Sequence, residues 1–174
     1  EQGFDFDVLN DLSTSIKKLL SKKLKISIVL GGGNFIRGSS FSNGVVDRVT
    51  SDYMGMLGTV INSLALQSNL KKIGVESRVM TAISINRVAE PYIKNKASNH
   101  LEKNRVVIFA SGTGNPFFST DTAAVLRASE MKSDVILKGT KVDGIYNKDP
   151  VNHTDAQKIS KISYSDYLNK DIKV

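Results

Sequence analysis

Short apolar segments, each followed by a loop rich in glycine or bearing Lys and Thr, constrain the fold of this chain more than any other feature. The segment Lys25–Leu30 (KISIVL) runs into GGGNFIRG, Arg105–Ala110 (RVVIFA) into SGTGNPFFSTD, and Asp134–Lys138 (DVILK) into GTKVDG. Strands that are almost wholly apolar are typical of a parallel sheet covered on both faces. The sequence therefore predicts an α/β fold, a mainly parallel sheet with helices on both faces in three αβα layers.

Helical patterns separate these strands. Apolar residues recur at steps of three and four in Asp7–Leu20 and in Tyr53–Ile73, and weaker patterns predict two more helices, at Val88–Leu101 and Thr122–Lys132. Val75–Ile83 predicts a further strand, and the tail from Lys158 predicts one weak strand and a short helix around Tyr164–Leu168. The apolar stripe of Tyr53–Ile73 is wider than one core face, which indicates either a helix buried within the core or a contact between subunits.

Length and composition favour one globular domain spanning residues 1–174. The 174 residues suffice for one core, and 40% hydrophobic with 24% charged residues is an ordinary globular mixture. The opening EQGFDFDVLN is acidic, unlike a signal peptide, and no apolar run is long enough to cross a bilayer. There is no cysteine, and the two histidines, His100 and His153, interpreted as solvated residues, cannot form a metal site alone. We expect a cytoplasmic protein with no membrane partner and no resident metal.

The formal charge of +7 raises the question of nucleic-acid binding. The lysines are scattered in short pairs, such as Lys17–Lys18 and Lys71–Lys72, with no stripe interleaved with aromatic residues. This pattern favours a solvated surface over a nucleic-acid interface.

Ligands of open parallel sheets lie beyond the carboxyl ends of the strands, so we expect the three loops to meet at one edge. Glycines in GGGNFIRG allow backbone N–H groups to approach an anion, and phosphate is the natural guest. The loop is neither G-x-G-x-x-G nor a P-loop, because Ser39 rather than lysine follows Gly38. Within it, Arg37 is either a phosphate ligand or a surface arginine.

The second loop, SGTGNPFFSTD, gathers two glycines, Asn115, Ser119 and Thr120 at a predicted helix N-terminus. This is a dense set of donors for a charged ligand, or else a structural turn shaped by Pro116. Phe117 and Phe118 are either core residues or platforms for a nucleobase.

Two charged residues follow these loops. Asp121 either complements the helix dipole or orients a lysine or a magnesium-bound phosphate. Lys138 follows three apolar residues, at the predicted ligand edge, where its ammonium group would stabilise charge on a migrating phosphoryl group.

Four strings, GGGNFIRG, DYMGMLGTVINSLALQ, GTGNPFFSTDTAAVLRA and LKGTKVDGIYNKDP, closely resemble the bacterial UMP kinase branch of the amino-acid kinase family. The resemblance runs from about Gly3 to the end of the chain, and GTGNPFFSTDTAA is its most specific part. It implies phosphoryl transfer from ATP, accompanied by Mg²⁺ carried on the nucleotide, to UMP.

The resemblance also implies roles for individual residues. Gly32 and Asp52 would hold UMP, with Asp52 on the ribose hydroxyls. Eight loop residues would surround the rest of UMP: Thr113, Gly114, Asn115, Pro116, Phe117, Phe118, Ser119 and Thr120. Gly33 and Arg37 would meet the ATP phosphates, and Thr140, Tyr146 and Asp149 would line the adenine and ribose pocket. Lys138, with Arg37, would stabilise the transition state, and Asp121 would organise it.

The family opens with a strand ending in a K-L-S-G-like loop, and it continues some tens of residues past the equivalent of Val174. The resemblance thus indicates a kinase domain recorded without that first strand and without the C-terminal segment. It also implies a homo-oligomer, a hexamer built from dimers, and many members are activated by GTP and inhibited by UTP. Two rival functions stay open: an enzyme of the same fold acting on a small carboxylate or carbamate, and a non-catalytic nucleotide sensor.

Overall fold

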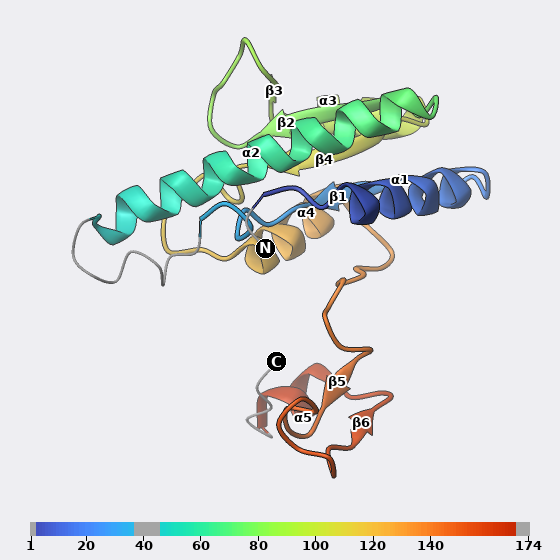
Figure 1. Cartoon of the computed structure of the whole chain (residues 1–174). Coiled ribbons are helices and arrows are strands. Elements are labelled where there is room, and N and C mark those ends of the chain that lie inside the picture. The colour runs from blue at the N-terminus through green and yellow to red at the C-terminus, as the bar shows by residue number, and fades with distance from the viewer. Residues whose placement is uncertain (1–2, 37–45, 170–174) are drawn as a thin grey trace. The chain divides into compact units, whose positions relative to one another are not determined.

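The computed structural model describes residues 3–36 and 46–169 of the chain (Figure 1). They form two compact units: the sheet unit, up to Ile136, and the C-terminal unit, from Leu137. Each unit has its own sheet. The expectation that all 174 residues make one domain stays a prediction.

Four parallel strands form the sheet of the sheet unit in the order β1-β4-β2-β3. They are β1 (Ser27–Val29), β2 (Ser77–Thr81), β3 (Glu90–Pro91) and β4 (Val106–Ala110). Strand β4 pairs with β1 on one side and with β2 on the other. Every β4 residue is buried, as expected for a short apolar strand at the centre of a covered sheet. The predicted parallel sheet is confirmed.

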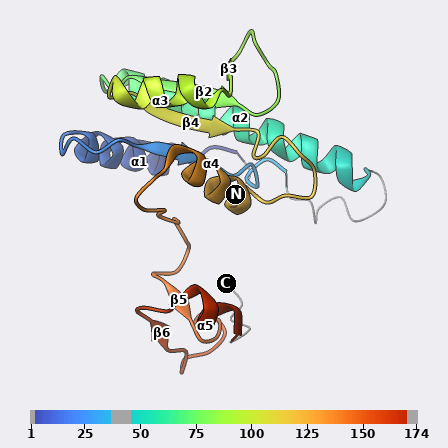
Figure 2. The ribbon, with the colours of Figure 1, turned by 180° about the vertical axis from the view of Figure 1, so that it is seen from behind.

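Helices cover both faces of this sheet (Figures 1 and 2). They are α1 (Phe6–Leu20), α2 (Arg48–Lys72), α3 (Lys94–Glu102) and α4 (Thr120–Met131). Alternate residues of a strand point to opposite faces, so β4 contributes to two core clusters. Val106, Ile108 and Ala110 belong to the cluster of α1 and α2. Val107 and Phe109 belong to the cluster of α3, against which Met131 of α4 also packs. The three-layer αβα prediction is therefore confirmed.

Side-chain caps set where the helices begin. Asp5 accepts hydrogen bonds from the N–H groups of Asp7 and Val8 at the start of α1. Asp47 accepts from Thr50 N–H at 3.0 Å, so α2 begins at Arg48, earlier than the predicted Tyr53. Such caps satisfy N–H groups that lack a partner within the helix.

Two predicted elements were wrong. The helix expected over Val88–Leu101 begins only at Lys94, and Glu90–Pro91 form strand β3 instead. Pro91 explains this, because the residue before a proline is biased towards extended backbone. The strand expected at Asp134–Lys138 is not formed, and Leu137 is 82% exposed. A strand needs a neighbour for its backbone groups, and among the described residues no strand pairs with this segment.

The C-terminal unit contains a two-stranded antiparallel sheet and one short helix. Its elements are β5 (Ile145–Tyr146), β6 (Lys158–Ile159) and α5 (Tyr164–Asn169). Ile145 pairs with Ile159, and Tyr146 with Lys158. The predicted weak strand and short helix in the tail are confirmed, whereas β5 lies in a segment expected to be a loop.

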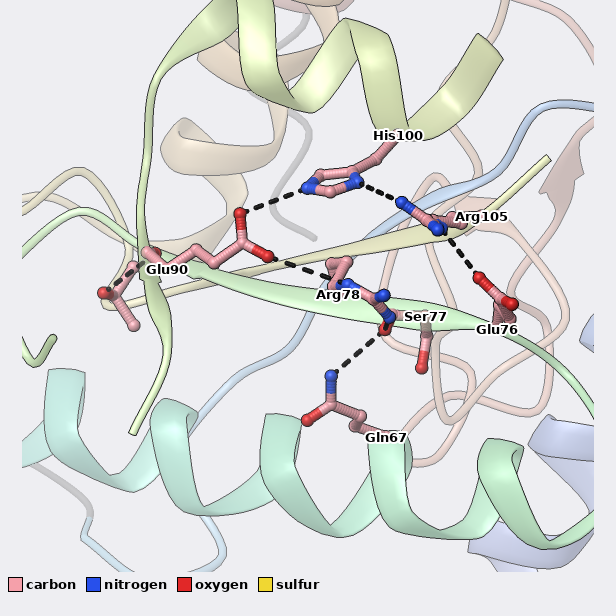
Figure 3. A network of polar contacts seen from close by, with 8 residues as sticks. Gln67, Glu76, Ser77, Arg78, Glu90, His100 and Arg105 are labelled. Atoms are coloured by element: carbon pink, nitrogen blue, oxygen red, sulfur yellow. Dashed lines mark hydrogen bonds and ion pairs between the residues drawn. The ribbon is translucent and has the colours of Figure 1, made fainter. Parts of the chain in front are cut away.

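A polar network ties β2, β3, α3 and the start of β4 together (Figure 3). Nε2 of His100 lies 3.1 Å from the Glu90 carboxylate, and Nδ1 lies 3.4 Å from Arg105. Arg105 in turn donates to Glu76 at 2.7 Å. The interpretation of His100 as a solvated residue was wrong, since its side chain is only 14% exposed. No sequence pattern around His100 indicated that Glu90 would be its partner.

Across residues 3–36 and 46–169, the search for a helix both long and apolar enough to span a bilayer finds no candidate.

Candidate functional site

A cleft of about 540 Å³ opens at the carboxyl ends of β1 and β4. Three segments of the sheet unit line it: the glycine loop after β1, the first turns of α2, and the loop from β4 to α4. This is the edge at which open parallel sheets bind ligands. Two of the three loops expected to meet therefore do so.

The glycine loop lies directly against α2. A Cβ placed on Gly32 would lie 2.4 Å from the backbone oxygen of Gly55 and 3.0 Å from the nitrogen of Thr59. The amides of Asn34 and Asn62 also bond to each other, at 2.7 and 3.0 Å, and Asn62 donates to the carbonyl of Gly31 at 2.7 Å. Glycine is thus needed at position 32 to let loop and helix backbones touch.

Asp52 stands at the wall of the cleft with three hydrogen bonds. Arg48, one helical turn earlier, donates from Nε to both carboxylate oxygens at 2.9 and 3.0 Å. The backbone N–H of Phe117 donates to the Asp52 carboxylate at 2.7 Å. Burial raises the pKa of Asp52, but the Phe117 and Arg48 hydrogen bonds together outweigh it and hold the pKa below its ordinary value. The group is an anion at neutral pH.

The β4–α4 loop bends through several left-handed residues. Gly112 and Gly114 have φ of +56° and +83°, and Ser111 and Phe117 have φ of 64° and 70°. Thr59 of α2 fixes the start of the loop, because its hydroxyl accepts from Ser111 N–H at 2.7 Å while donating to Met56. The loop therefore rests on α2 at both of its ends.

Helix α4 points its N-terminus at the cleft. Ser119 caps it by accepting from Thr122 N–H at 3.1 Å, and Ser119 and Thr120 both line the cleft. The positive end of the helix dipole thus faces the same space as the first turn of α2. Two helix N-termini and a glycine loop suit a phosphate-bearing ligand.

The structure brings most of the predicted UMP residues together. Those lining the cleft are Gly32, Asp52, Thr113, Asn115, Phe118, Ser119 and Thr120, joined by Gly33 from the predicted ATP set. Gly114, Pro116 and Phe117 belong to the same loop, and Asp121 lies in the first turn of α4. Phe117 and Phe118 are 67% and 59% exposed, which removes the alternative that they are core residues. Arg37 lies outside the described residues.

The remaining predicted residues belong to the C-terminal unit. Tyr146 donates its hydroxyl to Asp143 at 2.5 Å, and Lys158 donates to the other oxygen of the same carboxylate at 2.7 Å. The hydrogen bond to Asp143 raises the pKa of Tyr146. Asp149 accepts from Val151 N–H at 2.9 Å. Thr140 bonds to the carbonyl of Val142, and Lys138 is exposed on the segment before it.

Sequence reasoning missed five cleft residues on α2: Arg48, Ser51, Gly55, Met56 and Thr59. A signal for Arg48 was present, because Arg and Asp four residues apart on a helix form a pair. The backbones of Gly55 and Gly58 lie against Gly32, a contact that no spacing along the chain indicates. Nothing local marks Thr59, whose role depends on the distant Ser111.

The Asp52 contacts predict a pH-dependent stability. Since the pKa of Asp52 is lower in the folded than in the unfolded state, its stabilising contribution exists above the unfolded pKa and is lost as pH falls through the folded pKa. The excess unfolding free energy of wild type over Asp52→Asn should therefore be present at pH 7 and shrink below about pH 4. Urea unfolding at several pH values measures it. An excess that grows with acidity would contradict the assignment.

Comparison with known proteins places this geometry in context. The family model described as "Amino acid kinase family" matches residues 2–173. The uridylate kinase of Sulfurimonas denitrificans is 52% identical over 173 residues, which cover 99% of this chain and 73% of that protein. The uridylate kinase of Neorickettsia sennetsu is 54% identical over 172 residues, 98% of this chain and 72% of that one. The crystal structure of UMP kinase from Bacillus anthracis superposes with a TM-score of 0.95 at 40% identity, covering 99% of this chain and 72% of that one.

Proposed function

The chain belongs to the amino acid kinase family, and from that premise we propose that it transfers the γ-phosphoryl group of ATP to UMP, giving UDP and ADP. The observation that carries this proposal is the cleft in which Asp52, the glycine loop and the β4–α4 loop meet. Relatives that share more than half of the sequence over almost the whole chain bear the name uridylate kinase. The cleft supplies the anion-binding groups that such a substrate requires.

UMP occupies the cleft in this proposal. Asp52 accepts hydrogen bonds from the ribose hydroxyls, for which an ionised carboxylate is a strong acceptor. Gly32 lets the substrate approach the backbone, and the loop from Thr113 to Thr120 surrounds the remainder. The exposed ring of Phe118, which lines the cleft, offers a stacking surface for the base.

The chemistry needs little from a general base, because the UMP phosphate is already ionised near neutral pH. One of its oxygens attacks the γ-phosphorus of ATP in line, the bond to the β-phosphate oxygen breaks, and ADP leaves. Lys138 and Arg37 stabilise the charge on the migrating group, and Asp121 orients them. Catalysis then rests on positioning and charge neutralisation.

In this proposal Gly33 and Arg37 bind the phosphates of ATP, and Thr140, Tyr146 and Asp149 bind its adenine and ribose. The ATP substrate would carry Mg²⁺, which would offset negative charge on its phosphate oxygens. The acidic residue among the described cleft residues, Asp52, is engaged by Arg48 and Phe117. This arrangement fits a metal carried by ATP better than one held by the cleft.

The same proposal includes assembly as a homo-oligomer, a hexamer by resemblance, in the cytoplasm. An apolar stripe on α2, formed by Val49, Tyr53, Leu57 and Ile61, is 39% to 47% exposed in the single chain. These residues recur at intervals of four, so they share one side of the helix. Burial of this stripe between copies of the chain explains why α2 carries more apolar residues than its packing against the sheet requires.

Parallel assays of ADP release with UMP, CMP and N-acetylglutamate as acceptors test the function. We expect kcat/KM for UMP to exceed that for CMP by at least tenfold, because a donor that pairs with the uracil carbonyl would face another donor in the cytosine amino group. No release is expected with N-acetylglutamate. Equal rates with all three acceptors would favour the rival enzyme of the same fold. Tight UMP binding without any turnover would favour the nucleotide sensor.

A further inference from the structure

Arg48 is the charged cleft residue to which the proposed reaction gives no role. It stands at the first position of α2, and its side chain is 64% exposed while that of its partner Asp52 is only 18% exposed. An exposed pair four residues apart on a helix normally contributes little to stability. Arg48, Asp52 and Phe117 are nevertheless joined to one another by three contacts, two of which involve the Asp52 carboxylate.

The first contact fixes the orientation of Asp52. The Nε–H of Arg48 is shared between both carboxylate oxygens, at 2.9 and 3.0 Å. This charge-assisted contact keeps the carboxylate directed towards the guanidinium. The carboxylate keeps acceptor capacity for a further ligand, because two oxygens offer about four lone-pair sites.

The second contact joins Asp52 to the β4–α4 loop. Oδ2 of Asp52 accepts from the N–H of Phe117, 65 residues away along the chain, at 2.7 Å. Phe117 has φ of 70°, which a phenylalanine adopts only when its surroundings hold it there. The hydrogen bond to Asp52 supplies that restraint.

The third contact returns to Arg48. Its guanidinium carbon lies 5.7 Å from the centroid of the Phe117 ring, within the range of a cation–π interaction. Arg48, Asp52 and Phe117 thus form a closed triangle of contacts, here termed the clasp. It joins the start of α2 to the β4–α4 loop, two of the segments that line the cleft.

We propose that Arg48 is a positioning residue for UMP: through the clasp it orients Asp52 towards the ribose and holds the β4–α4 loop in its substrate-binding shape. This inference rests on the proposed function and deepens it. Arg48 acts on the acceptor substrate and not on the phosphoryl group in transit. Its loss should therefore change UMP binding and leave the chemical step and ATP binding as they are.

Steady-state kinetics of Arg48→Ala and Arg48→Lys test this role. Arg48→Ala should raise the KM and Kd for UMP roughly tenfold, as expected for loss of a charge-assisted hydrogen bond at a partly exposed site. The kcat and the KM for ATP should stay within twofold of the wild-type values. Arg48→Lys should recover part of the affinity, since an ammonium keeps the charge without the planar fork. The control is Lys25→Ala, which removes an exposed ion pair with Glu102 at the other end of β1 and should change none of these constants.

Residue-resolved amide exchange supplies a second readout. The Phe117 amide should exchange several-fold faster in Arg48→Ala than in wild type, with exchange in β4 unchanged. Unaltered UMP affinity in a folded Arg48→Ala protein, or an equal loss in kcat and in both KM values, would overturn the positioning role. If the wild-type protein neither binds nor phosphorylates UMP, the proposed function is wrong, and the positioning role fails with it. If the Phe117 amide exchanges at the same rate in Arg48→Ala as in wild type, the clasp itself is disproved.

Discussion

Gly32→Ala should both destabilise the protein and abolish tight UMP binding. The added methyl group would lie 2.4 Å from the Gly55 carbonyl oxygen, and 3.2 Å from the carbonyl carbon of Gly58. These are backbone atoms, so the glycine loop and α2 must separate to make room. We expect a loss of about 1 to 3 kcal/mol in unfolding free energy, as for other overpacked sites, with UMP affinity reduced more than tenfold. Urea unfolding and calorimetric titration with UMP measure both effects.

Gly31→Ala is the matched control. The nearest atom to its new methyl group is the Thr120 hydroxyl oxygen at 3.9 Å, an ordinary contact distance. This variant should keep its stability within about 0.5 kcal/mol, the usual range for a harmless substitution. Equal unfolding free energies of Gly31→Ala and Gly32→Ala would show that glycine at position 32 serves no packing role. The glycine loop would then be able to shift away from α2.

Lys138→Ala should lower kcat by about 100-fold to 1000-fold, the size of effect seen when one transition-state donor is removed. UMP affinity should change far less, because in the proposed mechanism the lysine acts on the transferring phosphoryl group. Rapid-quench or steady-state kinetics, combined with UMP titration, separate the two quantities. Near-wild-type turnover would refute the catalytic role.

Lys141→Ala controls for the loss of positive charge in the same loop. Lys141 is exposed and lies three residues further on. Its removal should leave kcat within about twofold, since bulk charge at an exposed site is screened by salt. An equal fall in kcat for Lys138→Ala and Lys141→Ala would mean that the loop needs positive charge in general and not an ammonium group at position 138.

Local patterns were sufficient to predict the central strands and most of the helices. The β-branched run Val106–Ala110 and the apolar stripe on α2 each carry their period within a few residues, and both elements formed. The loops after β1 and β4 were also placed correctly at one edge, because parallel strands share a direction. Most predicted UMP residues line one cleft for this reason.

Pairings across the chain were not predictable. The segment Asp134–Lys138 has the composition of a strand, yet pairing rather than composition decides whether a strand forms, and its backbone has no partner strand among the described residues. Likewise, the bond from Phe117 N–H to Asp52 and the contact of Gly32 with Gly55 join residues far apart in sequence. Such contacts depend on tertiary geometry, which one sequence does not encode in any local signal.

Strand β4 also bears on how this protein tolerates change. Its five residues alternate between two cores, and the chain passes from its last residue, Ala110, straight into the cleft loop at Ser111. Interiors this densely packed transmit displacement instead of absorbing it. A bulkier residue on either face of β4 therefore moves the same strand end, so neither hydrophobic layer can be redesigned for thermal stability without altering the shape of the cleft.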